Sequence, residues 1–66
     1  MQILHFLLKD GYWLHARLDA IQGFVEGTGS EQYVQVAGHH TAEYRLAHYD
    51  AMKSAMRDWA EALANV

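Results

Sequence analysis

Residues 32–44 read QYVQVAGHHTAEY, and this stretch decides the fold that we expect for the chain. Its first five residues alternate polar and apolar side chains and include strand-forming types, which predicts a β-strand with Val34 and Val36 on one face. A glycine follows where the chain must turn. A three-residue loop at 37–39 would place the two valines on the same face as His40, Ala42 and Tyr44. The stretch therefore predicts a β-hairpin at about residues 32–44.

Two other interpretations of this stretch stay open. A two-residue loop would group the valines with His39, Thr41 and Glu43, which are more polar partners. Alternatively, a second helix could begin early, with Thr41 as its N-cap and Glu43 in its first turn. An isolated hairpin is only marginally stable in water, so predicted strands would have to pack against the rest of the chain.

The residues before the hairpin carry an apolar pattern with steps of three and four. Its members are Leu4, Leu7, Leu14, Leu18, Ile21 and Val25. Such spacing is typical of one face of a helix, so we expect a helix over about residues 2–26 with a weak point at Gly11. Asp10-Gly11 is also a turn dipeptide, and the alternative is a leading segment that stops at Asp10 before a helix that starts at Tyr12. Gly27 then ends the helix.

The last third of the chain repeats the helical spacing without a gap. Its apolar members are Tyr49, Met52, Met56, Trp59, Leu63 and Val66. They predict an amphipathic helix over about residues 46–64. The expected fold is α+β, a helix–β-hairpin–helix in one small domain spanning residues 1–66, with two helices packed on a two-stranded antiparallel sheet. The predicted core is Leu14, Leu18, Ile21, Val25, Val34, Val36, Tyr49, Met52, Met56, Trp59 and Leu63.

Composition limits the classes of function. The chain has 66 residues, a formal net charge of −3 and no cysteine, which argues against a disulfide framework and against direct nucleic-acid binding. The apolar run at residues 1–8 lacks a preceding positive charge and is too short to span a bilayer, so no membrane association is expected. We expect a cytoplasmic protein.

The polar residues form no recognisable catalytic or metal-binding motif. The five histidines include no His-x-x-x-His pair, and His5 and His15 would lie on different turns of the first helix. The carboxylates are scattered, and neither Ser30 nor Ser54 lies in a nucleophile motif. The sequence therefore predicts no metal, no cofactor and no enzymatic activity.

The aromatic residues are the best candidates for a binding surface. Phe6 and Trp13 lie seven residues apart, facing away from the leucine pattern of the expected helix, with Tyr12 and Phe24 beside them. A second apolar stripe on a chain this small predicts self-association or a partner protein. Trp59 instead lies in phase with the predicted core and is expected to be structural.

The sequence also resembles the gpW-like head–tail joining proteins of tailed phages. The likeness rests on Val34-Gln35-Val36, Gly38, Tyr44 and the helical pattern from Leu46 to Leu63, and covers about residues 12–65. It implies a helix–hairpin–helix fold and a non-enzymatic role in virion assembly, joining the portal of the filled head to the tail. It also implies location in the host cytoplasm or the virion. Expected partners are portal and tail proteins, or further copies of the chain. The alternative function is a small regulatory module that binds a protein as a helical-hairpin dimer.

Overall fold

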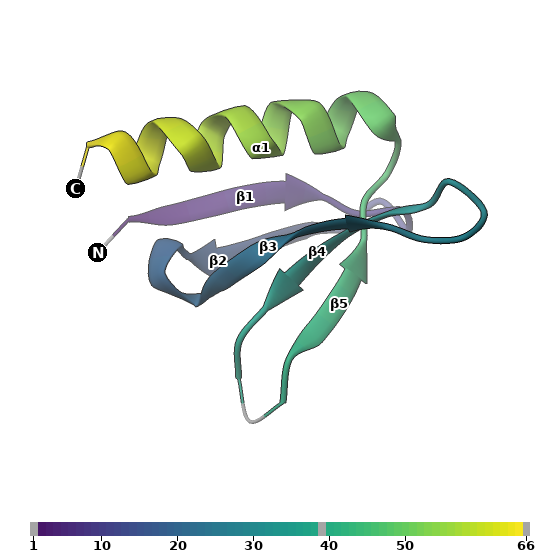
Figure 1. Cartoon of the computed structure of the whole chain (residues 1–66), viewed down its shortest axis with the longest axis horizontal. Coiled ribbons are helices and arrows are strands. Elements are labelled where there is room, and N and C mark those ends of the chain that lie inside the picture. Colours follow the sequence, from purple (N-terminus) through teal and green to yellow (C-terminus); the bar gives the residue numbers. More distant parts are fainter. Residues whose placement is uncertain (1, 39, 66) are drawn as a thin grey trace.

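The computed structural model describes residues 2–38 and 40–65, which form five β-strands and one α-helix (Figure 1). In chain order the elements are β1 (Ile3–Leu7), β2 (Trp13–Arg17), the 3₁₀ turn η1 (Leu18–Ala20), β3 (Ile21–Glu26), β4 (Gln32–Val36), β5 (Ala42–Arg45) and α1 (Tyr49–Ala64). The fold is α+β, but the predicted helix–hairpin–helix arrangement is wrong, because strands replace the first helix.

The strands form two antiparallel sheets. β1 pairs with β2, and the second sheet has the order β3-β4-β5. The two sheets meet where β1 and β5 end, since Leu8 bridges to Leu46 and the Ala47 N–H donates to the Leu7 carbonyl at 3.0 Å. Helix α1 lies along β1 and covers one side of the strands (Figure 1).

A tight turn at Gly11 explains why residues 2–26 do not form a helix. The Leu8 N–H donates to the Tyr12 carbonyl at 2.9 Å, and the Gly11 N–H donates to the Leu8 carbonyl at 3.0 Å. Gly11 has a φ of 93°, a conformation that glycine adopts without steric cost. The Asp10 carboxylate accepts from the Tyr12 N–H at 3.1 Å. Asp10-Gly11 therefore acts as the turn of a β1–β2 hairpin and not as a weak point in a helix.

A second tight turn separates β3 from β4. The Gly27 N–H donates to the Glu31 carbonyl at 2.7 Å, and the Ser30 N–H donates to the Gly27 carbonyl at 3.2 Å. Ser30 takes the left-handed position of this turn, with a φ of 66°. Gly27 thus belongs to a strand-to-strand turn, where the sequence predicted the end of a helix.

Strands β4 and β5 overlap the range predicted for the hairpin and end one residue later, at Arg45, with a different register. Val36 pairs with Ala42 and Val34 with Tyr44, so the valines share a face with these two residues, as the pattern indicated. The connection runs over residues 37–41 and includes His40, which was expected on the strand. His39 lies outside the described residues.

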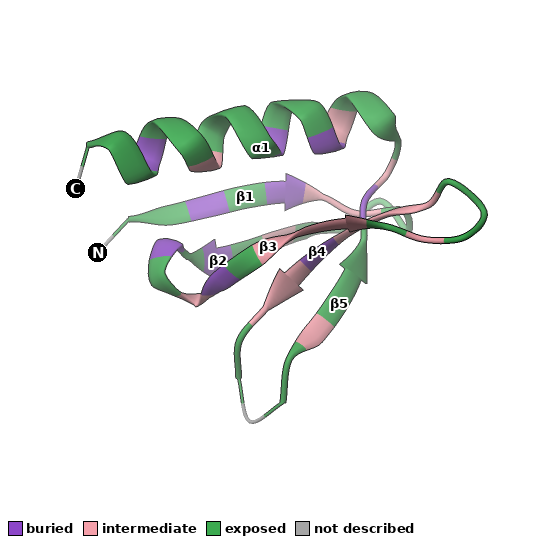
Figure 2. Ribbon diagram, viewed as in Figure 1, coloured by how far each residue is buried: buried purple, intermediate pink, exposed green. Residues whose placement is uncertain are grey.

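The buried residues lie in both sheets, in the helix and in the segments between them (Figure 2). Their side chains form one cluster. They are Leu4, Phe6, Ala16, Leu18, Ile21, Val34, Leu46, Met52, Ala55 and Ala62. Phe24 connects the two sheets to the helix, because its ring makes edge-to-face contacts with Phe6 at 5.8 Å and with Trp59 at 5.6 Å between centroids. Of the predicted core, Leu14, Val36 and Trp59 are partly buried against this cluster.

The side of helix α1 that faces the core matches the prediction only in part, since Met52 is buried and Trp59 packs against the core as predicted. Its buried residues are Met52, Ala55 and Ala62, whereas three predicted core residues are exposed: Tyr49 by 53%, Met56 by 42% and Leu63 by 46%. Alanines let the helix backbone approach the strands closely, so the contact centres on them and the larger side chains lie at its margin. Val66 lies outside the described residues.

One further core residue and the start of the helix differ from the prediction. Val25 is only half-buried and pairs with Tyr33, so it lies on the opposite face of the sheet from Phe24. The helix begins at Tyr49 and not at residue 46, because Leu46 is bridged to Leu8 and His48 is the N-cap.

Candidate binding groove

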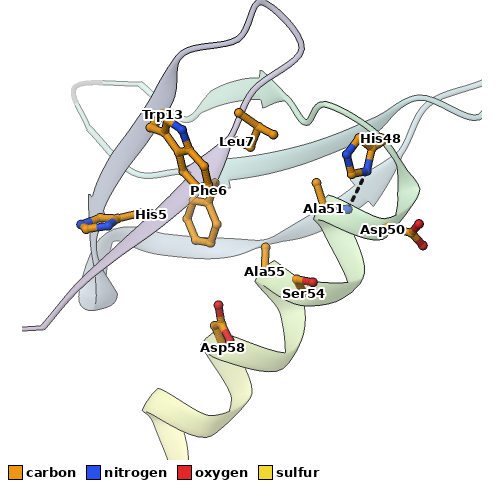
Figure 3. Close-up of a pocket in the computed structure, with 10 residues that line it drawn as sticks. All are labelled: His5, Phe6, Leu7, Trp13, His48, Asp50, Ala51, Ser54, Ala55 and Asp58. Carbon is orange, nitrogen blue, oxygen red and sulfur yellow. Dashed lines mark hydrogen bonds between the residues drawn. The ribbon is translucent and has the colours of Figure 1, made fainter.

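A groove of about 280 Å³ runs between the β1–β2 hairpin and the first half of α1. Figure 3 shows its lining, with hairpin residues on one side and helix residues on the other. The lining residues are His5, Phe6, Leu7, Trp13, His48, Asp50, Ala51, Ser54, Ala55 and Asp58. Concave sites with an apolar lining and a few polar groups are the usual form of binding sites.

The helix side of the groove is open because its side chains are small. Ala51, Ser54, Ala55 and Asp58 recur at steps of three and four and therefore share one face of α1. A longer side chain at any of the first three positions would fill the space that the groove occupies. The floor is apolar, since Phe6 and Leu7 contribute from β1.

Trp13 provides an aromatic wall on the hairpin side. It pairs across the strands with Leu7, so both side chains lie on the same face of the hairpin. That face points away from the core, and Trp13 is 59% exposed. A large aromatic side chain held on a strand and open to solvent is typical of a binding hot spot.

The charged groups of the groove are acidic. Asp50 and Asp58 line it, and among the described residues no lysine or arginine does. In Figure 3 the Asp58 carboxylate points from the helix towards the hairpin, whereas Asp50 lies at the other end, beside His48. A groove whose charged side chains are carboxylates favours a positively charged ligand.

His48 lines the groove and also begins the helix. Its Nδ1 accepts a hydrogen bond from the Ala51 N–H at 3.0 Å, so the ring acts as a side-chain N-cap. An imidazole that accepts at Nδ1 carries its proton on Nε2, which fixes the tautomer. The ring orientation is therefore set by the helix terminus.

His5 and His15 face each other across the hairpin. They are a directly opposed pair, and their rings lie in contact with centroids 4.4 Å apart and an angle of 31° between the ring planes. The sequence prediction placed them on separate turns of a helix. The alternation of apolar residues at 4, 6, 14 and 16, with polar or aromatic residues between, is the signal that could have found this pairing.

The polar side chains of the groove form no hydrogen-bonded catalytic pair within the described ranges 2–38 and 40–65. The hydrogen bond from Ala51 to His48 involves a backbone donor, and neither Ser54 nor Asp58 is bonded to a histidine there. In the same ranges, no group of three or more metal-binding side chains occurs.

The four residues predicted as a partner interface separate into two pairs. Tyr12 is 73% exposed and Trp13 lines the groove, so both lie on the surface. Phe6 is only 2% exposed and Phe24 packs between Phe6 and Trp59, so their assignment to a partner surface is wrong. The cause is the change from helix to strand, in which neighbouring residues point to opposite faces. His5, His48 and Asp58 belong to the groove and were missed as binding residues.

Within residues 2–38 and 40–65, no helix is long and apolar enough to cross a membrane. Comparisons of the chain with family models, with curated proteins and with solved structures gave no significant match.

Proposed function

We propose that the chain is a non-enzymatic protein-binding module whose groove receives an arginine or lysine side chain of a partner protein. The observation that carries this proposal is the combination of Trp13, an apolar floor and the carboxylates of Asp50 and Asp58 in one groove of about 280 Å³.

The shape of a basic side chain matches the distribution of polarity in the groove. Arginine and lysine place an aliphatic stem along apolar surface and keep the charged end at a polar margin. The half-buried side chains of Leu7 and Ala51 would contact the stem, and Asp58 would pair with the charged end. The face of Trp13 attracts the same cation through its π-electrons.

Electrostatics of the whole chain support the same partner class. The formal net charge is −3, so a basic segment is attracted at long range before it reaches the groove. A neutral side chain has no charge–charge attraction to Asp50 and Asp58, and an acidic side chain is repelled by them.

The head–tail joining role stays a prediction. It rested on a likeness that implied a helix–hairpin–helix fold, and the chain has a different fold. The alternative, a regulatory module, was likewise expected to form a helical hairpin, which the chain does not contain within its described residues. The groove supports what the two ideas share, namely binding to another protein without catalysis.

The proposal is tested by NMR titration of the isotope-labelled chain with the peptide acetyl-Gly-Arg-Gly-amide. The matched ligand replaces arginine by citrulline, which has the same shape and no charge. We expect the arginine peptide to shift the Trp13 indole and the Ala55 amide signals, and the citrulline peptide to bind several-fold more weakly. Equal binding of both peptides, or no shift with either, would overturn the proposal.

Substitutions separate the groove from general charge effects. Trp13→Ala and Asp58→Asn should each weaken arginine-peptide binding about two- to fivefold. Glu61→Gln is the control, because it makes the same change in net charge on the same helix outside the groove. Weakening by Glu61→Gln as large as that by Asp58→Asn would show non-specific attraction only.

A further inference from the structure

Strand β2 has a free backbone edge. The Leu8 N–H donates to the Tyr12 carbonyl and the Leu18 N–H donates to the Gln2 carbonyl, both at 2.9 Å. Hydrogen-bonded and non-hydrogen-bonded pairs alternate along an antiparallel ladder. Between these two bonds, the N–H and C=O groups of Leu14 and Ala16 therefore point towards β1. The N–H and C=O groups of the three odd-numbered residues point away from β1.

Those residues are Trp13, His15 and Arg17, and no described strand is hydrogen-bonded to this side of β2. Proteins commonly protect such an edge with a lysine, a proline or a β-bulge. The chain contains no proline, and the bulge lies in β3. The one charged side chain on the strand, Arg17, is already paired with Asp19 at 3.0 Å.

We propose that a second copy of the chain pairs with this edge, with the two β2 strands antiparallel about His15. Trp13 then stands opposite Arg17 of the second copy, and His15 stands opposite His15. Because all three residues point their backbone groups outward, this register satisfies every free group between Trp13 and Arg17 on both strands. A shift by two residues in either direction leaves a terminal pair unmatched.

The side chains are complementary in the same register. Directly opposed residues lie on one face of the sheet, so the Arg17 guanidinium meets the indole of Trp13 at each end of the pairing. Both side chains are largely exposed in the single chain. At the centre, His15 of each copy extends the ring contact that it makes with His5. The two β1–β2 hairpins become one four-stranded sheet with the order β1-β2-β2-β1.

The test combines sedimentation equilibrium with amide hydrogen exchange, at chain concentrations from about 10 μM to about 1 mM. We expect a monomer–dimer equilibrium, with exchange of the Trp13, His15 and Arg17 amides slowing as the dimer forms. A chain that stays monomeric over the whole range would overturn the proposal. Protection confined to the exposed helix residues Tyr49, Met56 and Leu63 would also overturn it, because the interface would then be α1.

Two variants test the register without changing the groove. His15→Pro removes a backbone donor that the single chain does not use, so the fold should persist while dimerisation weakens at least about tenfold. Arg17→Glu removes both cation–π contacts and should weaken it about five- to thirtyfold. Ala16→Pro is the control for the edge assignment, since the Ala16 amide faces β1 and its loss should unfold the hairpin. Unchanged dimerisation in the two test variants would refute the pairing.

Discussion

The substitution Phe6→Ala distinguishes most clearly between the observed β1–β2 hairpin and the helix that the sequence predicted for the same residues. Phe6 is 2% exposed, and its ring contacts Phe24, which in turn contacts Trp59. Phe6→Ala should therefore remove the transfer free energy of a buried aromatic ring and leave a cavity, a total loss of about 3–5 kcal/mol. A chain of 66 residues has a free energy of unfolding of roughly 3–10 kcal/mol, so the variant should lose a large part of its stability.

Urea denaturation followed by circular dichroism of α1 measures this loss. Trp13→Ala is the matched control, because Trp13 is 59% exposed on the opposite face of the hairpin and its removal should cost less than about 1 kcal/mol. If Phe6→Ala does not fold, Phe6→Leu gives a smaller loss that can still be measured. Similar losses in the Phe6 and Trp13 variants would refute the assignment of the two faces.

Three further predictions concern stability and are read from the same denaturation curves. Ser30→Gly should raise the free energy of unfolding by about 0.5–1 kcal/mol, because glycine relieves the left-handed conformation at a φ of 66°; a loss would contradict this turn geometry. His48→Ala should cost about 1 kcal/mol and His48→Asp should recover it, since aspartate also caps the helix and suits its positive end; equal stability of all three chains would mean that the cap contributes nothing. Met56→Lys should change stability by less than about 0.5 kcal/mol, because the side chain is exposed, and a loss of several kcal/mol would restore Met56 to the core.

The C-terminal half of the fold could be predicted from local patterns. The alternation at Val34 and Val36 identifies a strand because the two residues share one buried face, and the uninterrupted spacing after Tyr49 identifies a helix. The face of the helix could not be predicted from the size of its side chains. Because the helix packs closely against the strands, the small residues Ala55 and Ala62 are buried and the larger Met56 is exposed.

In the N-terminal half, the spacing of the apolar residues is compatible with both a helix and strands. A step of four residues, as from Leu14 to Leu18, keeps side chains on one face in a strand as well as in a helix. The buried pair Leu4 and Phe6 with Ala16 opposite favours strands, and only the long-range pairing of the two segments makes that pattern visible. The Asp10-Gly11 dipeptide was the strongest local sign of the hairpin.

The groove depends on contacts that no local pattern contains. Its wall at Trp13 and its carboxylate at Asp58 are far apart in the sequence and meet only because α1 lies along β1. The exposure of Trp13 could be anticipated from the surplus of aromatic residues. The positions of His5 and His48 in the groove could not, because they depend on the strand register and on the helix cap.

Residues 3–17 form a hairpin that buries Phe6 and exposes Trp13. The most direct measurement is the set of Hα–Hα nuclear Overhauser contacts in this segment, because non-hydrogen-bonded pairs bring opposed Cα atoms to about 4.5 Å. The structure predicts strong contacts between His5 and His15 and between Leu7 and Trp13. Sequential amide contacts and contacts between residues three apart, the pattern of a continuous helix, would contradict it.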